Sequence, residues 1–226
     1  GKTFTIQGAE IREDTKGDDG LMPRSAEYLF HALGVAQERA EANKVRFRYN
    51  VTCTFVEIYN EAIYDLLDSS PEKCVGLAYA NDGFVMTNAV QEVVNNAAEC
   101  RRLMVMGASN RHTSSTLMNC ESSRSHSVFT LNVSVEETSE LGDKITRHSR
   151  LHLIDLAGSE RLSNTGVSGE RLKETQNINK SLSMLSNVIA RINENVGAGR
   201  GKGHIHYRNS TLTKLLMDSL GGNSLT

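Results

Sequence analysis

The feature that most constrains the fold is the apolar run that begins at Leu151, stops at Asp155 and is followed by Gly158. Buried strands of α/β proteins are short apolar runs rich in Leu and Ile. A carboxylate at the end of such a strand can act on magnesium, and a nearby glycine lets the backbone approach a phosphate. The segment 151–161, LHLIDLAGSER, therefore predicts a nucleotide-sensing strand end, although a plain Asp turn also fits this pattern alone.

The first residues of the chain favour the nucleotide interpretation. Gly1, Lys2 and Thr3 match the end of the phosphate-binding pattern G-x-x-x-x-G-K-[ST]. In that pattern the Lys ammonium reaches the β- and γ-phosphates, the Thr hydroxyl binds magnesium, and the following helix favours an anion at its N-terminus. No strand or glycine-rich turn precedes these residues, so we expect residues 1–226 to be one internal part of a domain that begins within this loop.

A polar loop, SNRHTSSTLMNCESSRSH, is expected at residues 109–126, and its last part, NCESSRSH at 119–126, adds further candidates. The hydroxyls of Ser122, Ser123 and Ser125 are small ligands for magnesium or a γ-phosphate. Arg124 carries a planar charged fork that suits a carboxylate. The loop alone also fits a simple turn. However, Arg124 and Glu160 flank a predicted hairpin, so we expect them to pair and to close a phosphate pocket.

The order of the expected elements indicates an α/β fold. The alternation of residues 45–55 predicts a long strand, and residues 128–135 and 145–154 predict a hairpin with its turn at 140–143. A helix beginning near Pro23 should bury Tyr28, and a helix capped by Asn95 or Asn96 should end at Gly107. An amphipathic helix spans 178–192, and a short helix capped by Asn209 or Ser210 ends the chain.

Composition excludes several classes of protein. Among 226 residues, 38% are hydrophobic without a long apolar run, which predicts no membrane span and no secretory signal. The 4 cysteines form no C-x-x-C pair, so neither a zinc site nor a disulfide scaffold is expected, and a reducing cytosolic setting is favoured. Since the net charge is −2, an acidic partner would need a local basic patch.

Such a patch is present near the end of the chain. Residues 195–217 contain no acid, and they carry Arg200, Lys202, Arg208 and Lys214, while Lys173 and Lys180 lie on or near the amphipathic helix. The patch is either solvated surface or a docking site for an acidic polymer. It lacks the interleaved aromatic residues that stack on bases, so nucleic acid is not expected as a partner.

The segments NCESSRSH, LIDLAGSER, ERLKETQNINKSLSMLSNVI and HYRNSTLTKLLMDSLGGNS closely resemble the kinesin motor domain. The start GKTFT and the segments GLMPRSAEYLF and FVEIYNEAIYDLL resemble it as well, so the likeness spans essentially the whole chain. The resemblance implies an α/β, three-layer P-loop NTPase of kinesin type. Its central mixed β-sheet is flanked by helices and would lack its first strands here.

The resemblance also implies ATP and Mg²⁺ as cofactors and gives roles to site residues. Asp155 would act on Mg²⁺ through water, Gly158 would sense the γ-phosphate, and Glu160 would pair with Arg124 and relay a proton. The implied catalytic residues are Ser123, Arg124, Gly158 and Glu160. The implied nucleotide-binding residues are Gly1, Lys2, Thr3, Asn119, Ser122, Ser123, Asp155 and Gly158, with Thr3, Ser123 and Asp155 at the metal.

The implied partner is the microtubule, in the cytoplasm and cytoskeleton. The helix near residues 177–192 would lie on tubulin, and the implied contacts are Lys173, Lys180, Arg208 and Lys214. The chain departs from the family pattern H-I-P-Y-R-[DN]-S-K-L-T at His206 and Thr211, where one tubulin-facing charge would be missing. An oligomer formed through a coiled coil outside this chain stays possible.

The function expected from this resemblance is a microtubule-based motor whose ATP hydrolysis is coupled to filament binding and movement. The alternative is a microtubule-binding module that has lost its ATPase activity. A GTPase would share GKT and D-x-x-G, but the chain has no N-K-x-D motif that reads the base. We expect residues 1–226 alone to fold poorly and to be inactive, because unpaired sheet edges would be exposed.

Overall fold

The computed structural model describes residues 1–9, 11, 18–68, 70, 74–80, 83–117, 122–158, 170–197, 203–221 and 224. In chain order the elements are α1 (Lys2–Gln7), α2 (Leu21–Ala42), β1 (Arg46–Tyr59), β2 (Ala62–Asp65), β3 (Cys74–Ala80), β4 (Gly83–Thr87), β5 (Glu92–Val93), α3 (Ala97–Leu117), the 3₁₀ turn η1 (Ser122–Arg124), β6 (His126–Thr138), β7 (Lys144–Asp155), α4 (Glu170–Gly197), the 3₁₀ turn η2 (Tyr207–Asn209), α5 (Thr211–Leu215) and α6 (Met217–Leu220).

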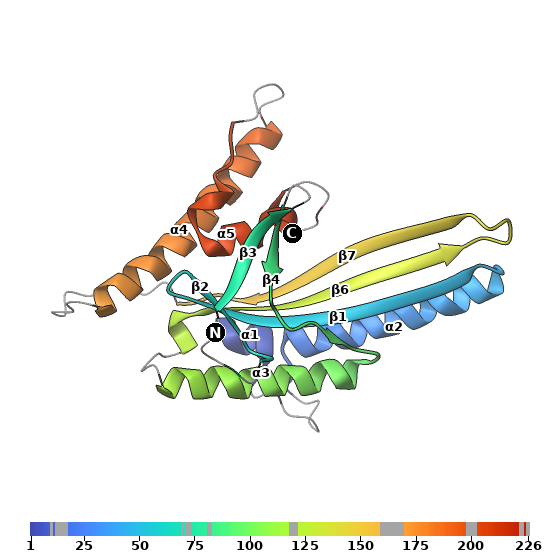
Figure 1. The fold of residues 1–226 in the computed structure, drawn as a ribbon, viewed down its shortest axis with the longest axis horizontal. Coiled ribbons are helices and arrows are strands. Elements are labelled where there is room, and N and C mark those ends of the chain that lie inside the picture. The colour runs from blue at the N-terminus through green and yellow to red at the C-terminus, as the bar shows by residue number, and fades with distance from the viewer. Residues whose placement is uncertain are drawn as a thin grey trace.

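The strands form one sheet in the order β4-β3-β2-β1-β6-β7, and β5 pairs with β1. Helices α1, α2 and α3 lie on one face of the sheet, and α4 and α5 lie on the other (Figure 1). The C-terminal half of β1 contributes side chains to a hydrophobic core on each face of the sheet. Cys53 and Phe55 pack in the core with α2 and α3, while Val56 and Ile58 pack in the core with α5. The predicted three-layer α/β architecture is therefore confirmed.

The predicted hairpin is formed by β6 and β7. Its register pairs Ser127 with Asp155 at one end and Thr138 with Lys144 at the other. Gly142 in the turn has φ 90°, a conformation that favours glycine. Because the strands are antiparallel, the loop before β6 and the loop after β7 emerge at the same end of the sheet.

Helix α3 does not end at Gly107, as the sequence predicted, but continues to Leu117. A Cβ atom built on Gly107 would lie 2.2 Å from Cδ1 of Phe55. The glycine therefore lets the helix pack closely on the sheet, and the helix tolerates the roughly 1 kcal/mol that an interior glycine costs. As a result Arg111, expected in a loop, lies on a helix and points into the protein interior.

Two other expectations need correction. Helix α2 starts at Leu21, and it buries Met22, Ala26 and Leu33 while Tyr28 is 74% exposed. The last predicted helix is broken at Leu216 into α5 and α6. The expected caps are present: Asn96 Oδ1 accepts from the backbone N–H of Glu99, and Ser210 Oγ accepts from the backbone N–H of Thr213.

Candidate nucleotide site

Asp155, the last residue of β7, is the centre of the candidate site. Its carboxylate is 1% exposed. The Thr3 hydroxyl donates to Oδ1 over 3.2 Å, and Gln7 Nε2 donates to Oδ2 over 3.5 Å. The fold therefore brings the first turn of the chain against the end of β7, and it joins two of the residues predicted to lie at the metal.

Arg111 is the site residue that sequence reasoning missed. Its Nη1 lies 3.2 Å from Asp155 Oδ2, and its Nε lies 3.1 Å from Glu57 Oε1. Its Nη2 donates to the carbonyl oxygen of Ser125 over 3.0 Å, and its Nη1 donates to Ser127 Oγ over 3.2 Å. One buried guanidinium thus compensates two buried carboxylates, as buried charges require.

The two predicted nucleotide-sensing loops meet through their backbones. The N–H of Gly158 donates to the carbonyl oxygen of Ser123 over 2.7 Å. Ser123 is exposed, and Arg124 and Gly158 are half-buried. Asn119, Glu160 and the side chain of Ser122 lie outside the described residues, so the pairing of Arg124 with Glu160 stays a prediction.

The donor set at Asp155 fits a magnesium–nucleotide ligand. Thr3 supplies a hydroxyl oxygen and Asp155 supplies a carboxylate, which are the hard oxygen ligands that Mg²⁺ prefers. Ser123, whose carbonyl oxygen bonds to Gly158, carries a further hydroxyl in the neighbouring loop. Lys2 is exposed at the start of α1. Burial lowers the pKa of His126, and the charges of Arg111 and, to a smaller extent, Lys2 lower it further. Within the described ranges, no group of 3 or more His, Cys, Asp or Glu side chains is placed to hold a metal.

The basic residues predicted at the filament lie on or beside α4 and α5. Lys180 is exposed on α4, and Lys214 is half-buried on α5. The guanidinium of Arg208 lies 5.2 Å from the centroid of the Tyr79 ring, a cation–π distance. The side chain of Lys173 is outside the described set. Helices α4 and α5 lie on the sheet face opposite α2 and α3 (Figure 1).

Thr211, which departs from the family pattern, has a structural role. It is 7% exposed, its backbone N–H donates to Glu61 Oε2 over 2.8 Å, and its hydroxyl donates to the Glu61 carbonyl oxygen over 2.8 Å. These bonds attach α5 to the β1–β2 turn. The ring of the other departing residue, His206, contacts that of His204 in a tilted arrangement, with ring centroids 4.8 Å apart and an interplanar angle of 52°.

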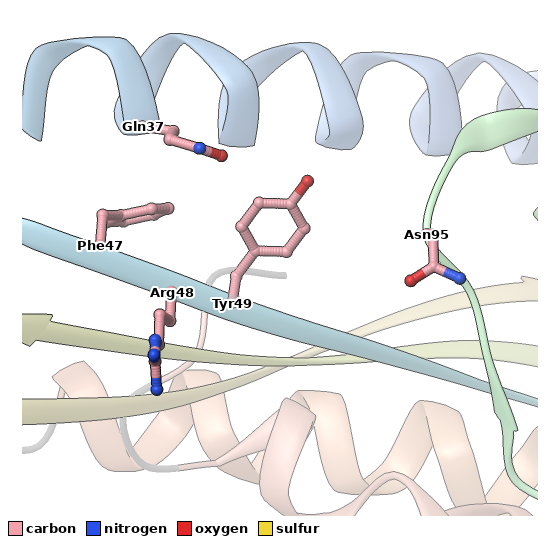
Figure 2. Close-up of a pocket in the computed structure, with 5 residues that line it drawn as sticks. All are labelled: Gln37, Phe47, Arg48, Tyr49 and Asn95. Carbon is pink, nitrogen blue, oxygen red and sulfur yellow. The ribbon is translucent and has the colours of Figure 1, made fainter. Parts of the chain in front are cut away.

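A pocket of 440 Å³ between α2 and β1 lies apart from Asp155. Phe47 and Tyr49 point from β1 toward Gln37 of α2, Asn95 lies at one end, and Arg48 points to the other side of the strand (Figure 2). None of the predicted nucleotide-binding residues lines this pocket, so we do not assign it to the candidate site.

None of the helices in the described ranges has the length and apolar character that crossing a membrane requires.

Comparisons with known proteins identify the family. The family model described as kinesin motor domain matches residues 1–226. Kinesin-like protein KIF15-A of Xenopus laevis is 46% identical over 228 residues, covering 100% of this chain and 16% of that protein. Kinesin-like protein KIN-12B of Arabidopsis thaliana is 43% identical over 230 residues, covering 99% of this chain and 17% of that protein. The chain thus spans a small part of these relatives.

Solved structures of kinesin motors are also similar to this chain. A structure described as that of a fast kinesin superposes with a TM-score of 0.79 at 35% identity, covering 99% of this chain and 58% of the other. A KIF14 dimer, in a two-heads-bound state with AMP-PNP and in complex with a microtubule, superposes with a TM-score of 0.78 at 36% identity. It covers 99% of this chain and 60% of the other.

Proposed function

Since the chain belongs to the kinesin motor domain family, we propose that it acts within a microtubule-based motor that hydrolyses ATP. The observation that carries this proposal is the contact between Thr3 and the buried carboxylate of Asp155, at the point where Gly158 meets Ser123. This arrangement places a phosphate-loop hydroxyl, a strand-end acid and two loop backbones together. It is the constellation that a magnesium–nucleotide site needs.

In the proposed site each residue has a distinct task. Lys2 reaches the phosphates, Thr3 and Ser123 contribute hydroxyls to Mg²⁺, and Asp155 acts on the ion through water. When bound, Mg²⁺ neutralises charge on the phosphate oxygens. The Arg111 guanidinium fixes the direction of the Asp155 carboxylate, because it donates to Oδ2 while Thr3 donates to Oδ1.

The reaction we propose is the in-line attack of water on the γ-phosphate, which breaks the bond between its phosphorus and the β–γ bridging oxygen and releases ADP and phosphate. Arg124 and Glu160 pair to close the pocket, and Glu160 relays the proton that leaves the attacking water. The N–H of Gly158 senses the γ-phosphate. When the γ-phosphate is bound, this N–H would leave the carbonyl oxygen of Ser123, and loss of the phosphate would let the bond from Gly158 to Ser123 form again. This exchange of partners is the event that the rest of the motor detects.

The proposed track is the microtubule, whose surface is acidic, so the protein would work on the cytoskeleton in the cytoplasm. Support comes from the position of α4 and α5, which carry Lys180 and Lys214, on the same face of the sheet (Figure 1). Arg208 lies in η2, just before α5. Clustered cations attract an acidic polymer although the chain carries a net charge of −2. Lys173 is proposed as a further contact.

Steady-state ATP turnover by the full-length protein, with and without microtubules, tests this proposal. We expect turnover to rise with microtubules, and Glu160→Ala to retain nucleotide binding while losing nearly all hydrolysis. Asp143→Asn, in the exposed β6–β7 turn, is the matched control and should match the wild type. A protein that binds microtubules but hydrolyses no ATP would instead be a binding module, and unchanged turnover by Glu160→Ala would refute the assigned role.

A further inference from the structure

His126, the first residue of β6, touches both the loop after β7 and helix α4. The backbone N–H of Ala157 lies 2.9 Å from its Nδ1, and its Nε2 lies 2.7 Å from the hydroxyl oxygen of Ser181 on α4. His126 is 3% exposed and Ser181 is 2% exposed. The buried His126 side chain therefore connects Ala157, the residue before Gly158, to Ser181 of helix α4.

The hydrogen bonds of this link have a fixed direction. An amide N–H can only donate, so Nδ1 must accept, and a neutral imidazole then carries its proton on Nε2. Nε2 therefore donates to Ser181 Oγ, and the Ser181 hydroxyl donates to the carbonyl oxygen of Ile178 over 2.8 Å. Burial, together with the charge of Arg111, lowers the pKa of His126 to about 4, which keeps the ring neutral at pH 7.

This chain of bonds starts beside the proposed phosphate sensor. The N–H of Gly158 is bonded to Ser123, and the preceding N–H, that of Ala157, is bonded to His126. A movement of Gly158 displaces the Ala157 amide. Because hydrogen bonds weaken steeply with misalignment, that displacement must break the bond to Nδ1 or move the imidazole and Ser181 with it.

We propose that His126 is a positioning residue that couples the loop 156–158 to α4 through Ser181. The proposal rests on the motor function proposed above. In that function α4 lies on the filament, and the state of the nucleotide must reach it. A His buried only for stability would make the same contacts, so the test must separate coupling from folding.

The test uses Ser181→Ala in the full-length protein, because this change removes the α4 end of the link and leaves the Ala157 bond intact. The control is Ser186→Ala, on the same helix, whose hydroxyl is exposed and bonds to the Leu182 carbonyl oxygen over 3.0 Å. The rescue variant is Ser181→Thr, which keeps a hydroxyl that a helix accommodates. The measurements are ATP turnover without and with saturating microtubules, and microtubule affinity with AMP-PNP and with ADP.

We expect Ser181→Ala to keep microtubule-free turnover within about twofold of the wild type and to lower the microtubule-stimulated ratio about tenfold, the effect of losing one buried hydrogen bond. The difference in affinity between the two nucleotide states should shrink as well. Ser181→Thr and Ser186→Ala should both behave like the wild type.

Three outcomes would overturn the proposal. One is an unchanged ratio in Ser181→Ala. Another is a parallel fall of both turnover rates with faster amide hydrogen exchange in α4 and β6, which indicates a purely structural role. In the third, wild-type protein shows no turnover or no filament binding, and then the proposed function itself fails and the coupling fails with it.

Discussion

The backbone N–H of Gly158 donates to the carbonyl oxygen of Ser123 over 2.7 Å, and this bond joins the two loops that leave the β6–β7 hairpin. The β6–β7 register pairs Ser127 with Asp155, and it therefore brings the loop before β6 close to the loop after β7. Arg111 reinforces it, because its guanidinium contacts Asp155 on one side and the carbonyl oxygen of Ser125 on the other. The geometry of the candidate site therefore depends on a helix residue outside both loops.

Replacing Arg111 with Ala should strongly destabilise the region around α3 and β1. The change would leave the carboxylates of Glu57 and Asp155 buried without this cation, and breaking a buried ion pair in this way costs about 3–5 kcal/mol. The free energy of local opening, measured by amide hydrogen exchange in the full-length protein, checks this expectation. Arg102→Ala, at an exposed position on the same helix, should change it by less than about 0.5 kcal/mol.

A comparable loss in Arg102→Ala, or protection in Arg111→Ala equal to that of the wild type, would contradict this account. A double variant, Arg111→Met with Glu57→Gln, removes two of the three charges. It should be less destabilised than the sum of its single variants, since interacting residues are not additive.

The two helix-interior glycines, Gly107 and Gly34, should respond in opposite directions to replacement by Ala. A Cβ on Gly107 would lie 2.2 Å from Phe55 Cδ1, whereas a Cβ on Gly34 would have no heavy atom within 4 Å. We expect Gly107→Ala to lose about 1–3 kcal/mol through overpacking, and Gly34→Ala to gain about 0.5–1 kcal/mol through helix propensity. Urea denaturation of the two variants measures the difference, and equal effects would refute the packing role of Gly107.

Acid should weaken the fold through histidines whose pKa values are lowered in the native protein. Burial, with the charge of Arg150, lowers the pKa of His152 from its ordinary value of 6.5 to about 4. Between these values the unfolded chain binds a proton that the native protein does not, so stability is lost as the pH falls through this window. His152→Asn, which can still accept from Thr130, should reduce the stability lost between pH 6.5 and 5 by about 1 kcal/mol.

His148→Asn, at an exposed position on the same strand, is the control for that measurement and should keep the full pH dependence of the wild type. Urea denaturation at a series of pH values provides the data. A His152→Asn protein with the same acid sensitivity as the wild type would show that another group carries the effect.

The elements that the sequence predicted well are those with strict local periodicity. Alternation located β1, β6 and β7, and the run that ends at Asp155 fixed the end of β7 to the residue. Turn and cap chemistry located Gly142 and Ser210. These features depend on near neighbours in the chain, which is why a single sequence contains them.

The features that the sequence did not reveal depend on contacts between distant residues. Gly107 was interpreted as a helix end because nothing local indicates that Phe55 would pack against it. Arg111 was assigned to a polar loop because its neighbours in the sequence are polar and its partners, Glu57 and Asp155, are distant in the chain. Thr211 stands where the family pattern has a charged Lys, so the sequence indicated only the loss of a charge. In the structure its hydroxyl donates to the carbonyl oxygen of Glu61 in the β1–β2 turn.

The last prediction concerns the basic face formed around α4 and α5. Lys180→Ala and Arg208→Ala should each raise the microtubule concentration needed for half-maximal turnover about fivefold without changing the maximal rate, because each removes about 1 kcal/mol of attraction to an acidic surface. Added salt should reduce both effects, since exposed charges are screened. Arg147→Ala, on β7 and paired with Glu137, is the control away from this face and should match the wild type. If all three variants weaken binding equally, overall charge attracts the filament, and the face around α4 and α5 has no special role.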